Sequence, residues 1–219
     1  MKGADAKERI LDAAERLFSE EGLDGVSVRA VTAEAGLNVA AVNYHFGSKA
    51  ALLSAMVRRF FARVSAERLR RLDELEVSAG GKPPPVEDLV VAFAVPVFEL
   101  FDEHRAREWG QAWMATRGTD GQDRGVSPMT FGETEVERRY QAALGQTLPW
   151  LSSEELRWRL ERANSLLMAN QGRRVMGPAA TGATVPAAGE ERRWLITFLT
   201  GALGAPSSIG ENTSNGQEG

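Results

Sequence analysis

The spacing of apolar residues is the feature that most limits what this chain can fold into. Apolar side chains recur every three or four positions along most of its 219 residues, while the alternation expected of a β-strand is nearly absent. This spacing places apolar side chains along one stripe of a helix, which is then buried against other helices. The sequence therefore predicts an all-α protein.

Glycine, proline and capping residues divide this pattern into separate helices. In the first half we expect helices over about residues 6–20, 28–35 and 39–45, followed by a long helix from Ser48 to about residue 77. In the second half we expect an apolar helix kinked at Pro96, a helix with Trp109 and Trp113, and helices over about 133–147, 153–175 and 190–203. Loops are expected at 80–85, 118–132 and 177–189.

The glycine- and proline-rich connector over residues 80–85 separates the helices before it from those after it. Residues 206–219 are polar enough to remain a disordered tail.

The cysteine and histidine content excludes several kinds of functional site. The chain has no cysteine, and its two histidines are His45 and His104. Disulfides, thiolate nucleophiles, Cys-ligated metals and multi-histidine metal sites are therefore excluded. No apolar run approaches the roughly 18–20 residues that cross a bilayer. We predict a cytoplasmic protein that needs no metal or cofactor and does not contact a membrane.

The charge is distributed unevenly along the chain. The formal net charge is −4, yet residues 27–71 carry eight basic and two acidic side chains, a local net charge of +6. A basic block within an acidic protein is expected where one face meets a polyanion. The alternative is a solvated helix face, which the arginine-rich stretch over 58–71 fits in part.

Two short helices joined by a tight turn predict an element that reads DNA. Only Gly36 and Leu37 separate the first of these helices from Asn38, which can cap the second. A three- or four-residue turn with a left-handed glycine makes the two helices cross steeply. The second helix then exposes a small, polar face that suits a major groove, made of Val39, Ala40, Asn43 and Tyr44.

The stretch from Gly25 to Leu52 resembles the DNA-binding domain of the TetR family of transcriptional repressors. The similarity covers residues 6–66, and its most specific part is Tyr44-His45-Phe46-Gly47-Ser48-Lys49-x-x-Leu52. The chain departs from the family pattern at Thr32, Asn43 and Ala50. We expect the Thr32 hydroxyl to bond to the Val28 carbonyl. The resemblance implies a helix-turn-helix domain over 6–66 and a ligand-binding and dimerisation domain over 67–205.

Lys49 lies in the first turn of the long helix, where the helix dipole disfavours a cation. A DNA phosphate held by the unpaired N–H groups of that turn would reverse this penalty. Asn43 carries an amide suited to an adenine edge. His45 and Lys49 taken alone would be ordinary surface residues, but the motif favours contact with DNA. We predict that the DNA-binding residues are Arg29, Asn38, Val39, Ala40, Asn43, Tyr44, His45 and Lys49.

The second domain contains no motif of similar specificity. An aromatic- and methionine-rich set could line an apolar cavity for an effector, although each member could equally be ordinary core: Phe93, Val97, Phe98, Phe101, Trp109, Trp113, Met114 and Met129. The last two helices could form an intersubunit four-helix bundle or pack within one chain. The residues predicted to lie in that interface are Leu156, Leu160, Ala163, Leu167, Trp194, Phe198 and Leu199.

Three functions compete for this sequence. The favoured one is a homodimeric repressor that leaves a near-palindromic double-stranded DNA operator when it binds a small, apolar effector. An all-α enzyme is disfavoured because the chain has no thiol, histidine pair or phosphate-binding glycine loop. An adaptor that acts without DNA would not depend on Tyr44 or Lys49.

Overall fold

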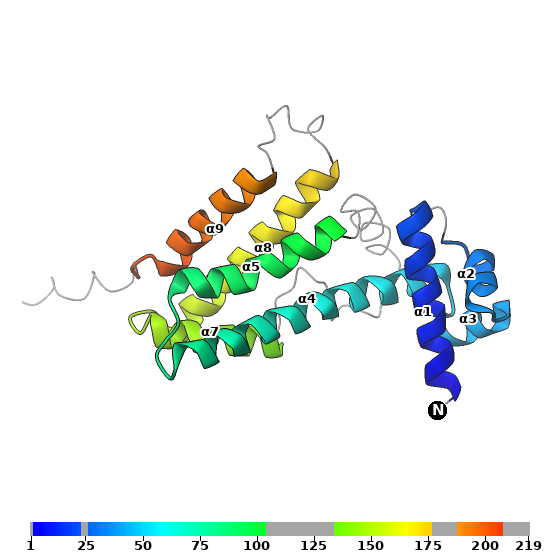
Figure 1. Cartoon of the computed structure of the whole chain (residues 1–219), viewed down its shortest axis with the longest axis horizontal. Coiled ribbons are helices and arrows are strands. Elements are labelled where there is room, and N and C mark those ends of the chain that lie inside the picture. The colour runs from blue at the N-terminus through cyan, green and yellow to red at the C-terminus, as the bar shows by residue number, and fades with distance from the viewer. Residues whose placement is uncertain (1, 23–25, 104–133, 177–187, 208–219) are drawn as a thin grey trace, which may run out of the picture. The chain divides into compact units, whose positions relative to one another are not determined.

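The computed structural model describes residues 2–22, 26–103, 134–176 and 188–207. Every regular element in these ranges is an α-helix, which confirms the predicted all-α fold. In chain order (Figure 1) the helices are α1 (Lys2–Glu21), α2 (Val28–Ala35), α3 (Val39–Phe46), α4 (Lys49–Ala79), α5 (Val86–Glu103), α7 (Glu135–Thr147), α8 (Ser153–Met176) and α9 (Ala188–Gly204).

The helix ends lie close to the positions predicted from the sequence. Helix α4 ends at Ala79, and two left-handed glycines follow it, Gly80 with φ 58° and Gly81 with φ 85°. Helix α5 contains Pro96 within its length. The predicted helix around Trp109 and Trp113, the loop at 118–132, and most of the loop at 177–189 and of the tail lie outside the described residues.

The chain divides into two compact units, and the first change between them falls between residues 66 and 67, inside α4. Unit 1 contains residues 1–66, 97–130 and 168–185, and unit 2 contains residues 67–96, 131–167 and 186–219. The expected domains did not include these later returns of the chain to unit 1. Helices α4, α5 and α8 therefore contribute residues to both units.

The N-terminal part of unit 1 is built around the predicted apolar stripe of α1. Ile10, Ala14 and Phe18 are buried, whereas Leu17 is half-buried. Helices α1, α2 and α3 are in mutual contact. Their shared core is closed by buried residues of the two short helices and of α4, namely Val31, Ala35, Val42, Leu52, Met56 and Phe60.

Unit 2 has a core of its own, to which α4, α5, α7, α8 and α9 all contribute. Its buried side chains include Leu72, Leu89, Val90, Tyr140, Leu144, Leu156, Leu160 and Leu203. No helix in the described part of the chain is both long and apolar enough to cross a bilayer.

Candidate nucleic-acid interface

Capping residues hold the starts of α2 and α3, and a left-handed glycine ends α2. The Ser27 hydroxyl accepts a hydrogen bond from the Ala30 N–H at 3.1 Å, and the Asn38 amide oxygen accepts one from the Ala41 N–H at 2.9 Å. Gly36 ends α2 in the left-handed conformation, with φ 62° and ψ 37°. The predicted Asn38 cap and the predicted left-handed glycine of the turn are thereby confirmed. The Asn38 oxygen is engaged as a cap, so only its NH₂ group is available to donate to DNA.

Arg9 on α1 also holds this turn in place, and the sequence reasoning missed it. Its Nη2 donates a hydrogen bond of 2.6 Å to the backbone oxygen of Ala35, the last residue of α2. A cation at this end of a helix is favourable because the last carbonyl groups lack partners within the helix. Arg9 and Ala35 are 26 residues apart, so no local sequence pattern could predict this contact.

Thr32 satisfies its hydroxyl differently from the prediction. Its Oγ1 donates to the Arg29 carbonyl oxygen at 2.9 Å, rather than to the Val28 carbonyl. A threonine hydroxyl can reach either the i−3 or the i−4 carbonyl, and here it takes the nearer one. Thr32 itself is buried and still packs within unit 1.

Helix α3 presents most of its surface to solvent. Its sole buried residue is Val42, whereas Val39 is 44% and Tyr44 85% exposed. Ala40 and Asn43 are also exposed, and His45 is half-buried. A large aromatic side chain left open beside an exposed amide is the arrangement expected of a face that binds a partner. The predicted reading face is therefore accessible.

The start of α4 lies beside this face in sequence. The Ser48 hydroxyl accepts from the Ala51 N–H at 3.1 Å, and Lys49 is exposed in the first turn. The rings of Tyr44 and His45 are 5.0 Å apart, edge to face. Lys7 of α1, which the sequence reasoning missed, places its Nζ 6.0 Å from the centroid of the Phe46 ring. Lys7 thus places an amine near the end of α3, which lies three positions before Lys49 in sequence.

Several arginines of the basic block are engaged within the protein and are not free to contact DNA. Arg59 forms ion pairs with Glu8, Asp12 and Glu15 on α1, and Arg63 pairs with Glu15 at 3.0 Å. Farther along α4, Arg70 and Arg71 both pair with Glu67, and Arg68 is buried. Local net charge in the sequence could not reveal these partners, because they are far away along the chain: Asp12 lies 47 residues from Arg59, and Glu15 lies 48 residues from Arg63.

Two cations of the block are clearly available to a polyanion. Arg29 and Lys49 are exposed and make no ion pair with any residue that the structure describes. The effective positive surface is therefore smaller than +6 suggests, and its two cations lie within the helix-turn-helix (Arg29) and just after it (Lys49).

The predicted effector-binding residues are only partly described. Phe93, Val97 and Phe98 are almost fully buried. The Phe93 ring packs edge to face on Tyr140, with 5.1 Å between ring centroids. The side chain of Phe101, and Trp109, Trp113, Met114 and Met129, lie outside the described part.

The predicted dimer residues fall into two groups, and one of these requires a correction. Five are buried within the chain's own packing, so they cannot form an exposed surface in this structure: Leu156, Leu160, Ala163, Leu167 and Leu199. The sequence pattern identified the apolar stripe but not which side of it the chain itself covers. Trp194 and Phe198 are 60% and 62% exposed.

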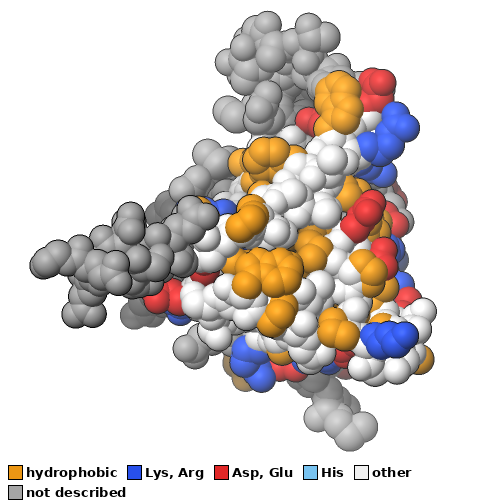
Figure 2. Space-filling view, turned by 90° about the vertical axis from the view of Figure 1, so that its left-hand side faces the viewer, with side chains coloured by type: hydrophobic (Ala, Val, Ile, Leu, Met, Phe, Trp, Pro, Cys, Tyr) orange, Lys and Arg blue, Asp and Glu red, His pale blue; other side chains and the backbone are white. Residues whose placement is uncertain are grey.

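Two further apolar side chains on α8 are exposed, Trp158 at 59% and Leu166 at 37%. Figure 2 shows a band of hydrophobic side chains on the side of the molecule where α9 lies, with few charged groups within the band.

No group of three or more His, Asp or Glu side chains suited to a metal ion occurs among the described residues.

Comparisons with known proteins agree with this architecture. Residues 10–56 match the model of the bacterial regulatory proteins of the tetR family. The uncharacterized HTH-type transcriptional regulator Rv1255c of Mycobacterium tuberculosis is 29% identical over 167 residues, 74% of this chain and 75% of that protein. The HTH-type transcriptional repressor AcnR of Corynebacterium efficiens is 34% identical over 79 residues, 36% of this chain and 42% of AcnR.

Other relatives match this chain over only 27% to 34% of their own length. Among solved structures, a proposed transcriptional regulator from Pseudomonas aeruginosa PAO1 shares the fold with a TM-score of 0.51. It is 20% identical, and the alignment covers 90% of this chain and 88% of that one.

These relatives are named as transcriptional regulators, which confirms the prediction that the chain is not an enzyme. The helix-turn-helix exposes its reading face and lies within residues 10–56, which match the family model, so the N-terminal part of the chain is a DNA-binding domain of the tetR-family type.

Proposed function

We propose that this regulator is a homodimeric repressor that binds a near-palindromic operator and is released by a small effector of apolar character. The observation that carries the proposal is the exposed face of α3. Asn43 and Tyr44 are exposed on this face, and Lys49 is exposed at the start of α4. An amide suits base edges in the major groove, and a cation suits a phosphate. The similarity to AcnR, which is named as a repressor, supports repression.

We infer the roles of the exposed residues from their chemistry. Asn43 reads a base edge, and Val39 and Ala40 contact thymine methyl groups. Contacts with phosphates fix the register of α3 in the groove, and they come from Lys49, Arg29, Tyr44 and His45. Asn38 contributes through its NH₂ group and by holding the start of α3.

The exposed apolar side chains of α8 and α9 support the homodimer. Four exposed apolar side chains of these helices belong to unit 2, and three of them are aromatic: Trp158, Leu166, Trp194 and Phe198. Exposed aromatic residues of this kind are enriched at interfaces between subunits. A second copy of the chain would cover them and place two copies of α3 on two half-sites, about one helical turn or a multiple of it apart.

Selection of bound sequences from a random pool of duplex DNA tests this function directly. We expect two inverted half-sites at a fixed spacing, and sedimentation of the protein alone should give the mass of a dimer. Half-sites without symmetry would contradict the homodimer. A failure to enrich any sequence, with retention of function by a Tyr44→Ala/Lys49→Ala variant, would favour an adaptor instead.

A further inference from the structure

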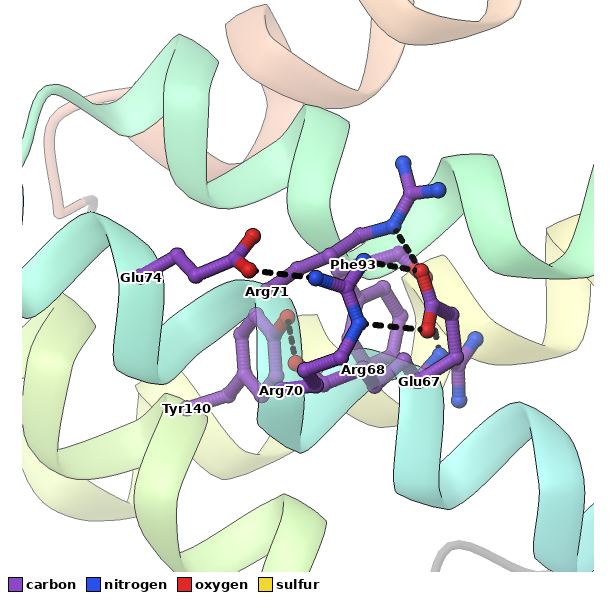
Figure 3. Close-up of polar contacts among 7 residues, drawn as sticks. All are labelled: Glu67, Arg68, Arg70, Arg71, Glu74, Phe93 and Tyr140. Atoms are coloured by element: carbon purple, nitrogen blue, oxygen red, sulfur yellow. Dashed lines mark hydrogen bonds and ion pairs between the residues drawn. The ribbon is translucent and has the colours of Figure 1, made fainter.

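Arg68 on α4 is a guanidinium within the core of unit 2. Its residue surface is only 5% exposed. Its Nε donates to the Phe93 backbone oxygen at 2.8 Å, and its Nη2 donates to the Asn164 amide oxygen at 3.2 Å. The Cζ atom lies 3.7 Å from the centroid of the Phe93 ring, so the cation stacks on an aromatic face. Figure 3 shows this residue beside Phe93 and Tyr140.

The charge of Arg68 is not balanced by any carboxylate that the structure describes. Its neighbour Glu67 is engaged by the outward-facing Arg70 and Arg71 (Figure 3), and Arg68 itself makes no ion pair with a described residue. Burial lowers the pKa of Arg68 to about 9, so it remains charged at neutral pH. Buried charges in proteins are normally paired, because an isolated one is costly to desolvate.

The side-chain polar groups of Arg68 and Asn164 that have no partner among the described residues are all hydrogen-bond donors. A guanidinium has five N–H groups, and described residues accept from two of them. Asn164, which is 2% exposed, directs its amide oxygen to Arg68, and its NH₂ group has no partner among the described residues. A cluster that offers only donors and one positive charge selects an acceptor with a negative charge.

We propose that Arg68 and Asn164 bind the carboxylate of an effector whose remaining body is apolar, an inference that rests on the proposed ligand-released function. One buried cation balances one negative charge, which favours a monocarboxylate over a phosphate dianion. The side chains shown beside Arg68 are aromatic, Phe93 and Tyr140, and suit the rest of such a molecule.

A purely structural role for Arg68 is the competing explanation. Pro96 lacks an N–H and so leaves a carbonyl without its usual partner in α5, and Arg68 donates to a carbonyl in the same turn. In that case Arg68 would stabilise unit 2 without affecting which ligands bind.

Calorimetric titration of the full-length protein with two pairs of probes distinguishes these explanations. The pairs are decanoate with decan-1-ol, and 2-naphthoate with 2-naphthalenemethanol, so that each pair differs in the carboxylate. We expect at least one carboxylate to bind the wild type at least tenfold more tightly than its alcohol. Arg68→Met should abolish that preference, and Arg70→Met, a matched change at an exposed site on the same helix, should leave it unchanged.

A second variant keeps the test decisive if Arg68→Met does not fold. Asn164→Asp places a carboxylate beside Arg68, so it should remain folded and lose carboxylate binding at least tenfold. Retention of the preference in either variant, or binding of neither carboxylate by the wild type, would overturn the proposal.

Operator binding, measured in parallel, separates this inference from the proposed function. Carboxylate binding that depends on Arg68 supports the site whether or not DNA binds. DNA binding without any carboxylate binding overturns the site alone, and absence of DNA binding overturns the repressor.

Discussion

Individual side chains of the interface carry different kinds of information. Lys49 presents a positive charge that any phosphate can satisfy, whereas Asn43 presents a donor and an acceptor whose partner depends on the base. Both are exposed, and neither is engaged by another described side chain. Substitution of each should therefore change DNA binding in its own way.

Lys49→Ala should weaken binding to operator and random DNA alike. Loss of one phosphate contact releases about one counterion fewer, so the slope of log Kd against log salt should become shallower by about 0.9. Fluorescence anisotropy over a range of salt concentrations measures this slope. Lys82→Ala, which removes an exposed lysine from the α4–α5 connector, should leave it unchanged.

Asn43→Ala should instead reduce discrimination at one base pair of each half-site. A bidentate contact contributes about 1–3 kcal/mol of discrimination, while affinity for random DNA should hardly change. Competition binding with single-base operator variants checks this. An equal loss on operator and random DNA would show that Asn43 positions the helix rather than reads the sequence.

Glu67 gives the protein a stability term that depends on pH. Hydrogen bonds from Arg70, and further ones from Arg71, lower the pKa of Glu67 from 4.5 to about 2 in the folded chain. Because the folded pKa lies below the unfolded one, this stabilisation is present above pH 4.5 and is lost as the pH falls towards 2. Denaturant unfolding should show that Glu67→Gln is less stable than the wild type at pH 7 and equally stable near pH 2. A constant difference across this range would contradict the assignment.

At the scale of elements, the crossing of α2 and α3 depends on the backbone of one residue. Gly36 has φ 62°, and a Cβ built there would lie 3.2 Å from the Arg9 Nη2 that caps α2. The left-handed conformation is unfavourable for a residue with a side chain, and the Arg9 contact adds a steric reason.

Gly36→Ala should therefore destabilise the chain by about 1–2 kcal/mol and reduce DNA affinity as the turn relaxes. Gly145→Ala is the control: its Cβ would lie 3.7 Å from Leu156 Cδ1, an ordinary contact inside α7, and it should stabilise the helix by about 0.5–1 kcal/mol. Thermal unfolding of both variants measures these effects. Equal behaviour of the two would contradict the role of Gly36.

The sequence predicted local features better than long-range ones. Caps and turns can be identified from the sequence because each depends on residues within four positions. This applies to Ser27, Gly36, Asn38 and Ser48. The partners of Arg59 on α1, the cap that Arg9 supplies and the burial of Arg68 depend on contacts between distant segments. The apolar stripe of α8 was visible too, but a pattern cannot say whether Leu160 or Trp158 faces the chain's own core.

For the whole molecule, the exposed aromatic side chains of α9 determine the predicted assembly. The double substitution Trp194→Ser/Phe198→Ser removes two large apolar contacts while leaving the core of unit 2 intact. We expect the dimer to dissociate at least tenfold more readily, because truncation of a central interface aromatic commonly costs 2 kcal/mol or more. Sedimentation over a range of concentrations measures this. Trp150→Ser, an equally exposed tryptophan outside both helices, should have no effect, and a similar loss there would contradict the proposed face.

Helix α4 runs without interruption across the change from unit 1 to unit 2 at residues 66 and 67. An α-helix advances about 100° per residue, so one residue inserted at this point would turn everything beyond it by that angle. Chimaeras that join this DNA-binding part to another regulatory part therefore have to preserve helical phase as well as the choice of domains. Insertions of seven residues, close to two full turns, would preserve that phase, whereas insertions of two or five would place the second part on the opposite or near-opposite side.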